Sequence, residues 1–324
     1  MTVGRKEVVI QKNDAGQRLD KFLTKAYPNL PRSMLYKSIR KKDIKLNGKR
    51  CEISTRLQEN DVLTMFLKDE FFQTQEKAYD FLKAPTKLQI LYEDDNILLA
   101  DKQPGLLVHP DETYHFDSLI ARIQHYLYEK GEYDPSQENA FAPSLVNRID
   151  RNTGGIVIAA KNASALRILN QKMKDRELDK RYLCLVHGIL EKKEGTLTGY
   201  LEKNEKQNRV YITQHRGEEG KTIKTRYRVL EERDHCSLVE VELLTGRTHQ
   251  IRAHFAHIGH PLLGDGKYGT NALNKKTKLP YQALYSYQLT FRFTTDGGIL
   301  NYLNGKTFTA KHIWFLDEFR KIGQ

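Results

Sequence analysis

The segment Gly154 to Ala160 constrains the fold of this chain most strongly, because its seven residues carry no polar side chain. The segment is far too short to span a bilayer, so it predicts a strand inside a sheet. Further segments of this kind alternate with helical ones and predict an α+β fold with a mixed sheet and flanking helices. The predicted strands include Ile97–Ala100, Ile156–Ala160, Tyr182–Val186 and Ser237–Leu243, and the predicted helices include Ser118–Glu129 and Ala163–Lys174.

Residues 14–67 are expected to form a separate small domain. Leu19, Phe22, Leu23 and Ala26 share one face of an amphipathic helix. A second short helix and a tight turn between two strands follow in the sequence. The residues behind these predictions are Ser33 as N-cap, Leu35 and Ile39 on one helix face, Ile44 and Leu46 in a strand, and Asn47-Gly48 in the turn.

The positive charge of the chain is concentrated near its N-terminus. The formal net charge is +12, and residues 1–70 hold 16 lysines and arginines against 9 acidic residues. Such an excess suits a polyanionic partner, although a basic surface can also serve solubility. Between Pro31 and Arg50 a dense basic set contains the single acid Asp43, which favours a phosphate-binding surface over a solvated helix face. The candidates are Arg32, Lys37, Arg40, Lys41, Lys42 and Lys45.

This N-terminal segment resembles the alpha-L RNA-binding domain, the type found in ribosomal protein S4. The resemblance rests on Ala15 to Leu23, on Ile44 to Lys49 and on the later Asn60-Asp61-Val62. A polar stretch without a clean period follows and predicts a linker. The predicted division of the chain is an S4-like RNA-binding domain at 14–67, a linker at 68–86 and a catalytic domain at 87–316.

Asp150 lies in a polar loop that leads through two glycines directly into the predicted strand. Loops that enter a sheet often present catalytic groups. An aspartate in such a loop can equally hold an Asx turn by pairing with Thr153 or with the backbone. The local sequence leaves both interpretations open.

A second polar segment, Leu244 to Pro261, carries arginines and histidines. Helical spacing from Thr248 to Ile258 places His249 and Arg252 near one face. Arg247 and Arg252 are candidates to hold a phosphate or to pair with a carboxylate, because a planar guanidinium does this better than an ammonium group.

The short spacing of His254, His257 and His260 would suit zinc. However, the sequence has no H-E-x-x-H motif, no acidic residue lies nearby before Asp265, and Pro261 shows that the helix has ended. We therefore expect these histidines to serve in polar capping and RNA contact, and we expect no metal. The cysteines lie far apart without a C-x-x-C pair, so they are expected to be reduced and packed as small hydrophobic residues; they are Cys51, Cys184 and Cys236.

Together these segments resemble the RluA family of pseudouridine synthases. Four family patterns occur in the expected order: H-R-L-D-x-x-T-S-G at 147–155, K-x-Y at 180–182, G-R-T-H-Q-I-R-x-H at 246–254 and G-D-x-x-Y-G at 264–269. The segment from Glu93 to Pro110 is similar to the start of the family domain. The chain departs from the family at several positions: Asn147 replaces histidine, Gly154 replaces serine, and Leu284-Tyr285-Ser286 stands where the family has L-H-A.

The resemblance implies an RNA pseudouridine synthase, an isomerase with a mixed, mainly antiparallel sheet. Asp150 would be the catalytic carboxylate, acting as a nucleophile at the sugar or as a base. Tyr182 would stack on the flipped uracil, and Arg252 would pair with Asp150. The reaction involves no redox change and no added group, so neither cofactor nor metal is expected. The implied RNA contacts in this domain are Arg148, Arg247, His249 and Gln250.

Large-subunit ribosomal RNA is the favoured substrate, because Ser164 to Arg167 and Lys180 to Tyr182 are similar to family members that act on it. Transfer RNA stays an alternative. A second alternative, a non-catalytic ribosome-assembly protein, would be supported by loss of the catalytic residues, and none is lost. A metal-dependent nuclease would need clustered carboxylates, which these motifs lack. Without an apolar leader or span, the protein is expected in the cytoplasm, with a monomer as the default.

Overall fold

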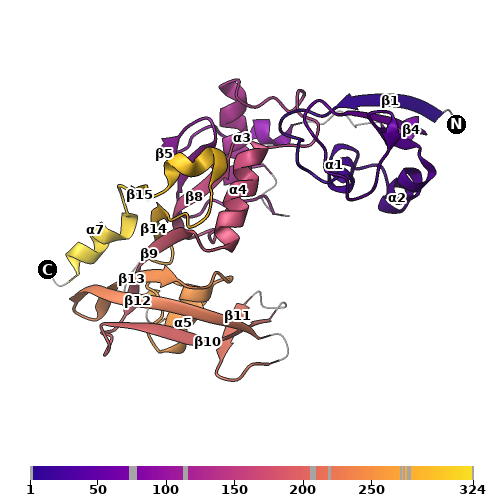
Figure 1. Ribbon diagram of the computed structural model, residues 1–324. Helices are drawn as coiled ribbons and strands as arrows, with labels where there is room; N and C mark the ends of the chain where they lie inside the picture. The colour runs from indigo at the N-terminus through magenta and orange to yellow at the C-terminus, as the bar shows by residue number, and fades with distance from the viewer. Residues whose placement is uncertain are drawn as a thin grey trace.

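The chain folds into two parts, which the computed structural model shows clearly (Figure 1). The indigo N-terminal residues form the smaller part, and the remaining residues build a large sheet with helices packed on it. Within the described residues, none of the helices has the length and apolar character needed to cross a membrane. The structure describes residues 3–72, 79–111, 116–204, 209–217, 220–270, 272, 274–275 and 279–322.

The N-terminal part is a four-stranded antiparallel sheet packed against two helices. Helix α1 (Leu19–Ala26) and helix α2 (Arg32–Lys41) bury the apolar faces predicted for them, including Phe22 and Ile39. The strands lie in the order β1 (Val3–Val9), β4 (Val62–Lys68), β2 (Ile44–Leu46) and β3 (Lys49–Arg50).

The structure adds a strand to the predicted N-terminal domain and corrects the predicted start of its second helix. Strand β1 lies outside the predicted range 14–67 and pairs with β4 along its whole length. Helix α2 begins at Arg32 with Pro31 as its N-cap, so the predicted N-cap at Ser33 is wrong. The proline ring holds φ at −61°, which suits the extended N-cap conformation, and Ser33 therefore falls inside the first turn.

The Asn47-Gly48 pair makes the predicted tight turn between β2 and β3. Both residues have positive φ, 51° and 72°, as the favoured two-residue hairpin turn requires. The Asn47 amide donates to Asp61 Oδ1 at 2.7 Å and accepts from the Val62 backbone N–H at 2.8 Å. These bonds join the turn to the start of β4.

In the described residues, eleven strands form one sheet whose neighbours are antiparallel except for β14 beside β8. The mixed, mainly antiparallel sheet is thus confirmed. The order is β11 (Arg209–Thr213), β10 (Glu194–Asn204), β12 (Lys221–Arg233), β13 (Cys236–Leu243), β9 (Leu178–His187), β14 (Leu284–Phe291), β8 (Gly154–Ala160), β6 (Ile97–Lys102) and β5 (Ile90–Glu93), while β15 (Thr307–Thr309) pairs with β14 and β7 (Ser144–Leu145) with β8.

Helices cover both faces of this sheet. Helices α3 (Leu119–Glu129) and α5 (Gln250–His257) pack with Tyr182 and other residues of one face. Helices α4 (Ala163–Lys174) and α7 (Trp314–Lys321) pack on the opposite face. The predicted helices at α3 and α4 are confirmed. Short 3-10 helices occur at η1 (Asp69–Phe71), η2 (Asp80–Lys83) and η3 (Gly298–Leu303).

The segment predicted as a linker, 68–86, contains η1 and η2, and its residues 73–78 lie outside the described residues. Its second half packs on the catalytic domain. The rings of Phe81 and Tyr133 lie 5.8 Å apart, and His125 Nδ1 lies 2.6 Å from the Ala84 carbonyl oxygen. Residues 79–84 therefore belong structurally with α3.

The two parts of the molecule meet through polar contacts at the start of α4. Asn13 donates to Glu138 Oε1 at 2.6 Å and accepts from the Ala163 backbone N–H at 3.2 Å. Arg167 of α4 donates to the Ala15 carbonyl oxygen. The first turns of α4 thus form part of the surface on which the N-terminal domain rests.

Candidate active site

A cleft of about 1100 Å³ brings together residues that are far apart in the sequence. Its walls come from the loop before β8, from β9 and from the segment that leads into α5. The predicted catalytic-domain residues that line it are Arg148, Asp150, Tyr182, Arg247, His249, Gln250 and Arg252.

Asp150 lies in the loop between β7 and β8, and the buried Asn147 fixes the start of this loop. The Asn147 amide donates to the Ile156 carbonyl at 3.2 Å and accepts from the Ile158 N–H at 2.8 Å. The Thr153 N–H donates to the Asp150 carbonyl oxygen at 3.1 Å. The turn is therefore closed by main-chain atoms and does not need the Asp150 carboxylate.

Lys102 holds the far side of the same loop, a role that sequence reasoning missed. Its ammonium group donates to the carbonyl oxygens of Arg151 and Leu106, both at 2.8 Å, and of Gln103 at 3.0 Å. The side chain is 1% exposed. Burial lowers the pKa of Lys102 to about 7, and the negative charge of Asp150 opposes this shift.

Arg252 on α5 connects Asp150 to a second, fully buried carboxylate. Its Nη1 donates to Asp150 Oδ2 at 2.8 Å, while Nε and Nη2 donate to the two oxygens of Asp265 at 2.7 and 2.9 Å. Asp265 also accepts from the backbone N–H groups of Lys267 at 2.9 Å and Tyr268 at 3.0 Å. The bidentate pair fixes the plane of the guanidinium group that faces Asp150.

Arg252 and Asp265 stabilise each other in their charged forms. Burial opposes the charge on Arg252, but the hydrogen bonds and charges of Asp265 and Asp150 outweigh it and raise the pKa of Arg252. Burial also opposes ionisation of Asp265, but Arg252 and the backbone N–H groups hold the pKa of Asp265 below its usual range. Arg252 and Asp265 are therefore an ionised pair behind Asp150.

His249 borders Asp150 from the N-cap position of α5, where it has a φ of 53°. Its Nδ1 lies 3.0 Å from the Tyr268 hydroxyl, and its Nε2 lies 3.8 Å from Asp150 Oδ2. Burial lowers the pKa of His249, and the charge of Asp150 opposes this shift. The imidazole thus lies beside the carboxylate without a direct hydrogen bond to it.

Tyr182 lies in the middle of β9, where it pairs with Val241 of β13 and with Ser286 of β14. The residue is 6% exposed and lines the cleft. Burial raises the pKa of Tyr182 to about 12, so the phenol is neutral at ordinary pH. Tyr182 therefore gives the cleft a rigid, uncharged aromatic side chain on the central sheet.

Gln250 is buried, and its amide is already used within the chain. It donates to the Lys224 carbonyl at 3.0 Å and to Thr225 Oγ1 at 2.9 Å. It accepts from Thr245 Oγ1 at 2.9 Å and from the Arg247 N–H at 3.2 Å. The side-chain amide of Gln250 therefore has no donor or acceptor left for RNA. We correct the predicted RNA contact: Gln250 instead positions the 245–247 loop.

The other predicted RNA contacts are accessible. Arg148 and Arg247 are exposed at the cleft. In the N-terminal domain Lys45 is half-buried, and its ammonium lies 5.8 Å from the centre of the Phe66 ring. The remaining predicted phosphate-binding residues are exposed on and just after α2; they are Arg32, Lys37, Arg40, Lys41 and Lys42.

The histidines considered as metal ligands contact separate groups. His254 Nδ1 lies 2.7 Å from Thr225 Oγ1, and His260 Nδ1 lies 2.8 Å from the His187 carbonyl oxygen. Among the described residues, no group of three or more His, Cys, Asp or Glu is arranged to hold a metal ion. The three cysteines are buried and free.

Comparison with known families identifies both parts of the chain. The family model of the S4 domain matches residues 17–63, and the model described as RNA pseudouridylate synthase matches residues 96–257. The fold and the cleft therefore define an RNA-modifying enzyme with its own RNA-binding domain. The chain belongs to the RNA pseudouridine synthase family, and its activity is the isomerisation of uridine to pseudouridine in RNA.

Related proteins match over most of their length. An uncharacterized RNA pseudouridine synthase of Mycoplasma genitalium is 34% identical over 87% of this chain and 88% of its own. A ribosomal large subunit pseudouridine synthase C of Haemophilus ducreyi is 33% identical over 83% and 81%. The structure of human RNA pseudouridylate synthase domain containing 1 is similar in fold, with a TM-score of 0.53 at 21% identity, over 78% of this chain and 99% of that one.

Proposed function

We propose that this enzyme isomerises uridines of large-subunit ribosomal RNA and that Asp150 carries the reaction. Relatives from Haemophilus ducreyi and Vibrio cholerae, each 33% identical to this chain, are named ribosomal large subunit pseudouridine synthase C. The observation that carries the chemical part of the proposal is the 2.8 Å bond from Arg252 to Asp150 inside the cleft.

Asp150 is suited to this reaction because its carboxylate lines a cleft and meets a fixed cation. The bond between uracil N1 and ribose C1′ must break, the uracil must rotate, and a bond from C5 to C1′ must form. A carboxylate can attack the sugar as a nucleophile or remove a sugar proton as a base, and both roles need its charged form. Arg252 donates a hydrogen bond to this carboxylate, and Asp265 keeps Arg252 in place.

The target uracil must leave its stack to reach Asp150. We propose that Tyr182 stacks on the flipped base, because its ring is rigid, neutral and located at the cleft. Arg148 and Arg247 are exposed beside it and would contact the neighbouring nucleotides. His249 would contact the substrate from the side of Asp150.

The N-terminal domain would add phosphate contacts that tolerate different sequences. We propose the domain limits 14–67 and 87–316, with β1 added to the first domain, and residues 79–84 and the rest of α7 added to the second. One chain supplies all the side chains named here, and ribosomal RNA is a cytoplasmic substrate. We therefore propose a monomer that acts in the cytoplasm.

The substrate can be tested with ribosomal RNA and transfer RNA labelled with tritium at C5 of their uridines. Forming the C5–C1′ bond expels that hydrogen, so release reports isomerisation. We expect release from large-subunit ribosomal RNA alone, at a small number of positions that sequencing can map. Release from transfer RNA alone would contradict the ribosomal assignment. A folded protein that binds both RNAs and releases nothing would instead fit an assembly factor.

A further inference from the structure

The cleft has a second basic side that the proposed reaction does not use. Lys174 ends α4, Arg176 follows it, and Lys180 lies on β9; all three line the cleft, and we name them the α4 rim. Lys174 and Arg176 are exposed. Lys180 precedes Tyr182 by two residues in the strand, so both side chains leave the same face of the sheet.

The α4 rim has no acidic partner within the described part of the chain. Among the described residues, no ion pair joins a carboxylate to Lys174, Arg176 or Lys180. The Lys180 ammonium has Met173 Sδ as its neighbour at 3.1 Å, and a thioether is a weak acceptor. Burial lowers the pKa of Lys180.

Arginines on the outer face of the same sheet are different, because each has a carboxylate partner. Arg181 and Arg228 donate to Glu240 at 2.8 and 3.3 Å, and Arg226 donates to Glu242 at 2.9 Å. That face mixes both signs of charge, as a solvated surface normally does. The contrast indicates that the α4 rim is arranged for an anion that comes from outside the chain.

The backbone at Arg176 supports this interpretation. Arg176 has a φ of 62°, in the left-handed region just after a helix, where glycine is strongly favoured. A residue with a Cβ loses about 1 kcal/mol there. An arginine at this position therefore points to a use for its side chain.

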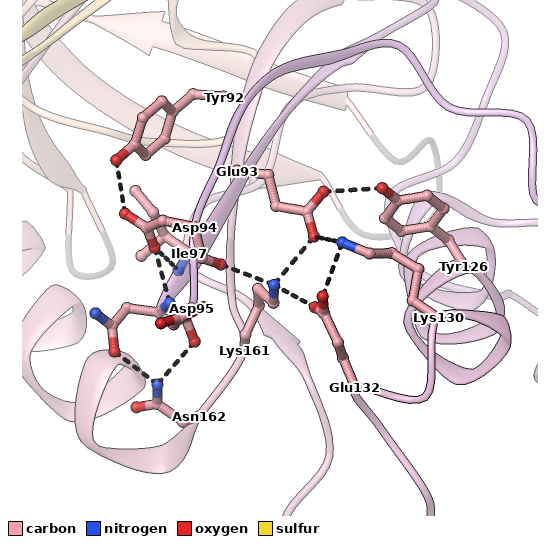
Figure 2. Close-up of polar contacts among 11 residues, drawn as sticks. Tyr92, Glu93, Asp94, Asp95, Ile97, Tyr126, Lys130, Glu132, Lys161 and Asn162 are labelled. Carbon is pink, nitrogen blue, oxygen red and sulfur yellow. Dashed lines mark hydrogen bonds and ion pairs between the residues drawn. The ribbon is translucent and has the colours of Figure 1, made fainter.

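Helix α4 is fixed at both ends, so the α4 rim projects from a rigid backbone. At its start, the Asn162 side chain accepts from the Ala165 N–H at 2.9 Å, and neighbouring Lys161 bonds Glu93 at 3.0 Å in the network of Figure 2. At its end, the buried Lys172 pairs with Glu177 at 2.6 Å. A rigid backbone lowers the entropy that the α4 rim loses when it binds a ligand, because only the side chains remain to be ordered.

The same helix connects the cleft to the N-terminal domain. Ala163 and Arg167 contact that domain, while Lys174 lines the cleft. Its 12 residues span about 18 Å at 1.5 Å per residue. An RNA strand that leaves the cleft along α4 therefore passes the α4 rim on its way to the N-terminal domain.

We propose that the α4 rim binds phosphates of the RNA strand next to the target uridine, between the cleft and the N-terminal domain. This inference rests on the proposed RNA substrate and adds a contact surface to it. Phosphate suits the site because it is the anion that an RNA substrate brings to the cleft. The competing explanation is that Lys174 and Arg176 only stabilise the carboxyl end of α4.

The test compares two double variants that remove the same charge. Lys174→Gln/Arg176→Gln changes the α4 rim, whereas Arg320→Gln/Lys321→Gln changes exposed cations of α7, which pair with Asp317 and Glu318. Helix α7 lies at the end of the molecule away from the N-terminal domain (Figure 1). Affinity for a large-subunit ribosomal RNA fragment is measured at several salt concentrations, together with kcat, KM and the melting temperature.

We expect the α4 rim variant to bind RNA more weakly, with a salt slope smaller by about 0.7 for each single-strand phosphate that the variant no longer binds. KM should rise while kcat stays unchanged. The control should keep wild-type affinity and slope. Wild-type affinity and slope in the α4 rim variant, with or without a lower melting temperature, would overturn the proposal. Because binding is measured without turnover, a failure of the proposed substrate would be seen separately, as an inactive wild-type enzyme.

Discussion

Gly154 and Tyr285 are in direct contact, and both depart from the family pattern. A Cβ added to Gly154 would lie 2.4 Å from Cε2 of the Tyr285 ring. Tyr285 is 1% exposed, and its hydroxyl donates to Asp101 Oδ1 at 2.6 Å. The tyrosine therefore fills the space that the family serine would need, at the point where the Asp150 loop enters β8.

The first prediction concerns this pair. Gly154→Ser should lower the free energy of unfolding by about 1–3 kcal/mol, because the core at Tyr285 becomes overpacked. Adding Tyr285→His should recover part of the loss, since the smaller ring leaves room for the serine. Urea unfolding of both single variants and the double variant measures the coupling. Strictly additive effects would mean that the two departures are independent.

Asp265 is predicted to act through Arg252. Asp265→Asn removes the negative charge and one of the two acceptor oxygens that hold a buried guanidinium, which should cost about 3–5 kcal/mol of unfolding free energy. It should also lower kcat, because Arg252 is no longer held toward Asp150. The matched control is Asp317→Asn, which breaks a surface pair with Arg320 and should cost less than about 1 kcal/mol. Wild-type kcat in a folded Asp265→Asn enzyme would refute the positioning role.

His254 should make stability depend on pH. Burial lowers its pKa to about 4, whereas an unfolded histidine titrates near 6.5. Below about pH 6.5 the unfolded chain takes up a proton that the folded protein does not, so stability is complete above that pH and falls toward pH 4. Urea unfolding between these values should show a smaller loss for His254→Asn than for wild type.

His235→Asn provides the control for this experiment, because the His235 side chain is 92% exposed. It should keep the wild-type pH dependence. If the His254 and His235 variants lose stability with pH in the same way, the buried imidazole is not the source of the effect.

Most of the regular structure could be predicted because apolar spacing is local information. The strands around Ile97, Ile156 and Tyr182 and the helices α3 and α4 lie where that spacing indicates. Strand β1 was missed because a run of charged side chains from Arg5 to Glu7 interrupts its apolar residues. It is stabilised by pairing with β4, which lies far away in the sequence.

Part of the candidate site could also be predicted, because sequence motifs are local information. Motifs identified Asp150, Tyr182 and Arg252, and the fold brings all three to one cleft. The bond from Lys102 to the Arg151 carbonyl joins residues 49 positions apart and has no local pattern. The interior position of Gln250 also depends on tertiary packing, here against Thr225 of β12.

The central claim is that Asp150 carries the isomerisation. The most direct test is tritium release from C5-labelled large-subunit ribosomal RNA by wild type and Asp150→Asn, with RNA affinity measured in parallel. The asparagine keeps the size of the side chain and an oxygen for Arg252, so folding and binding should persist. We predict release by the wild type and none by the variant at equal RNA occupancy. Release by Asp150→Asn at the wild-type rate would contradict the account.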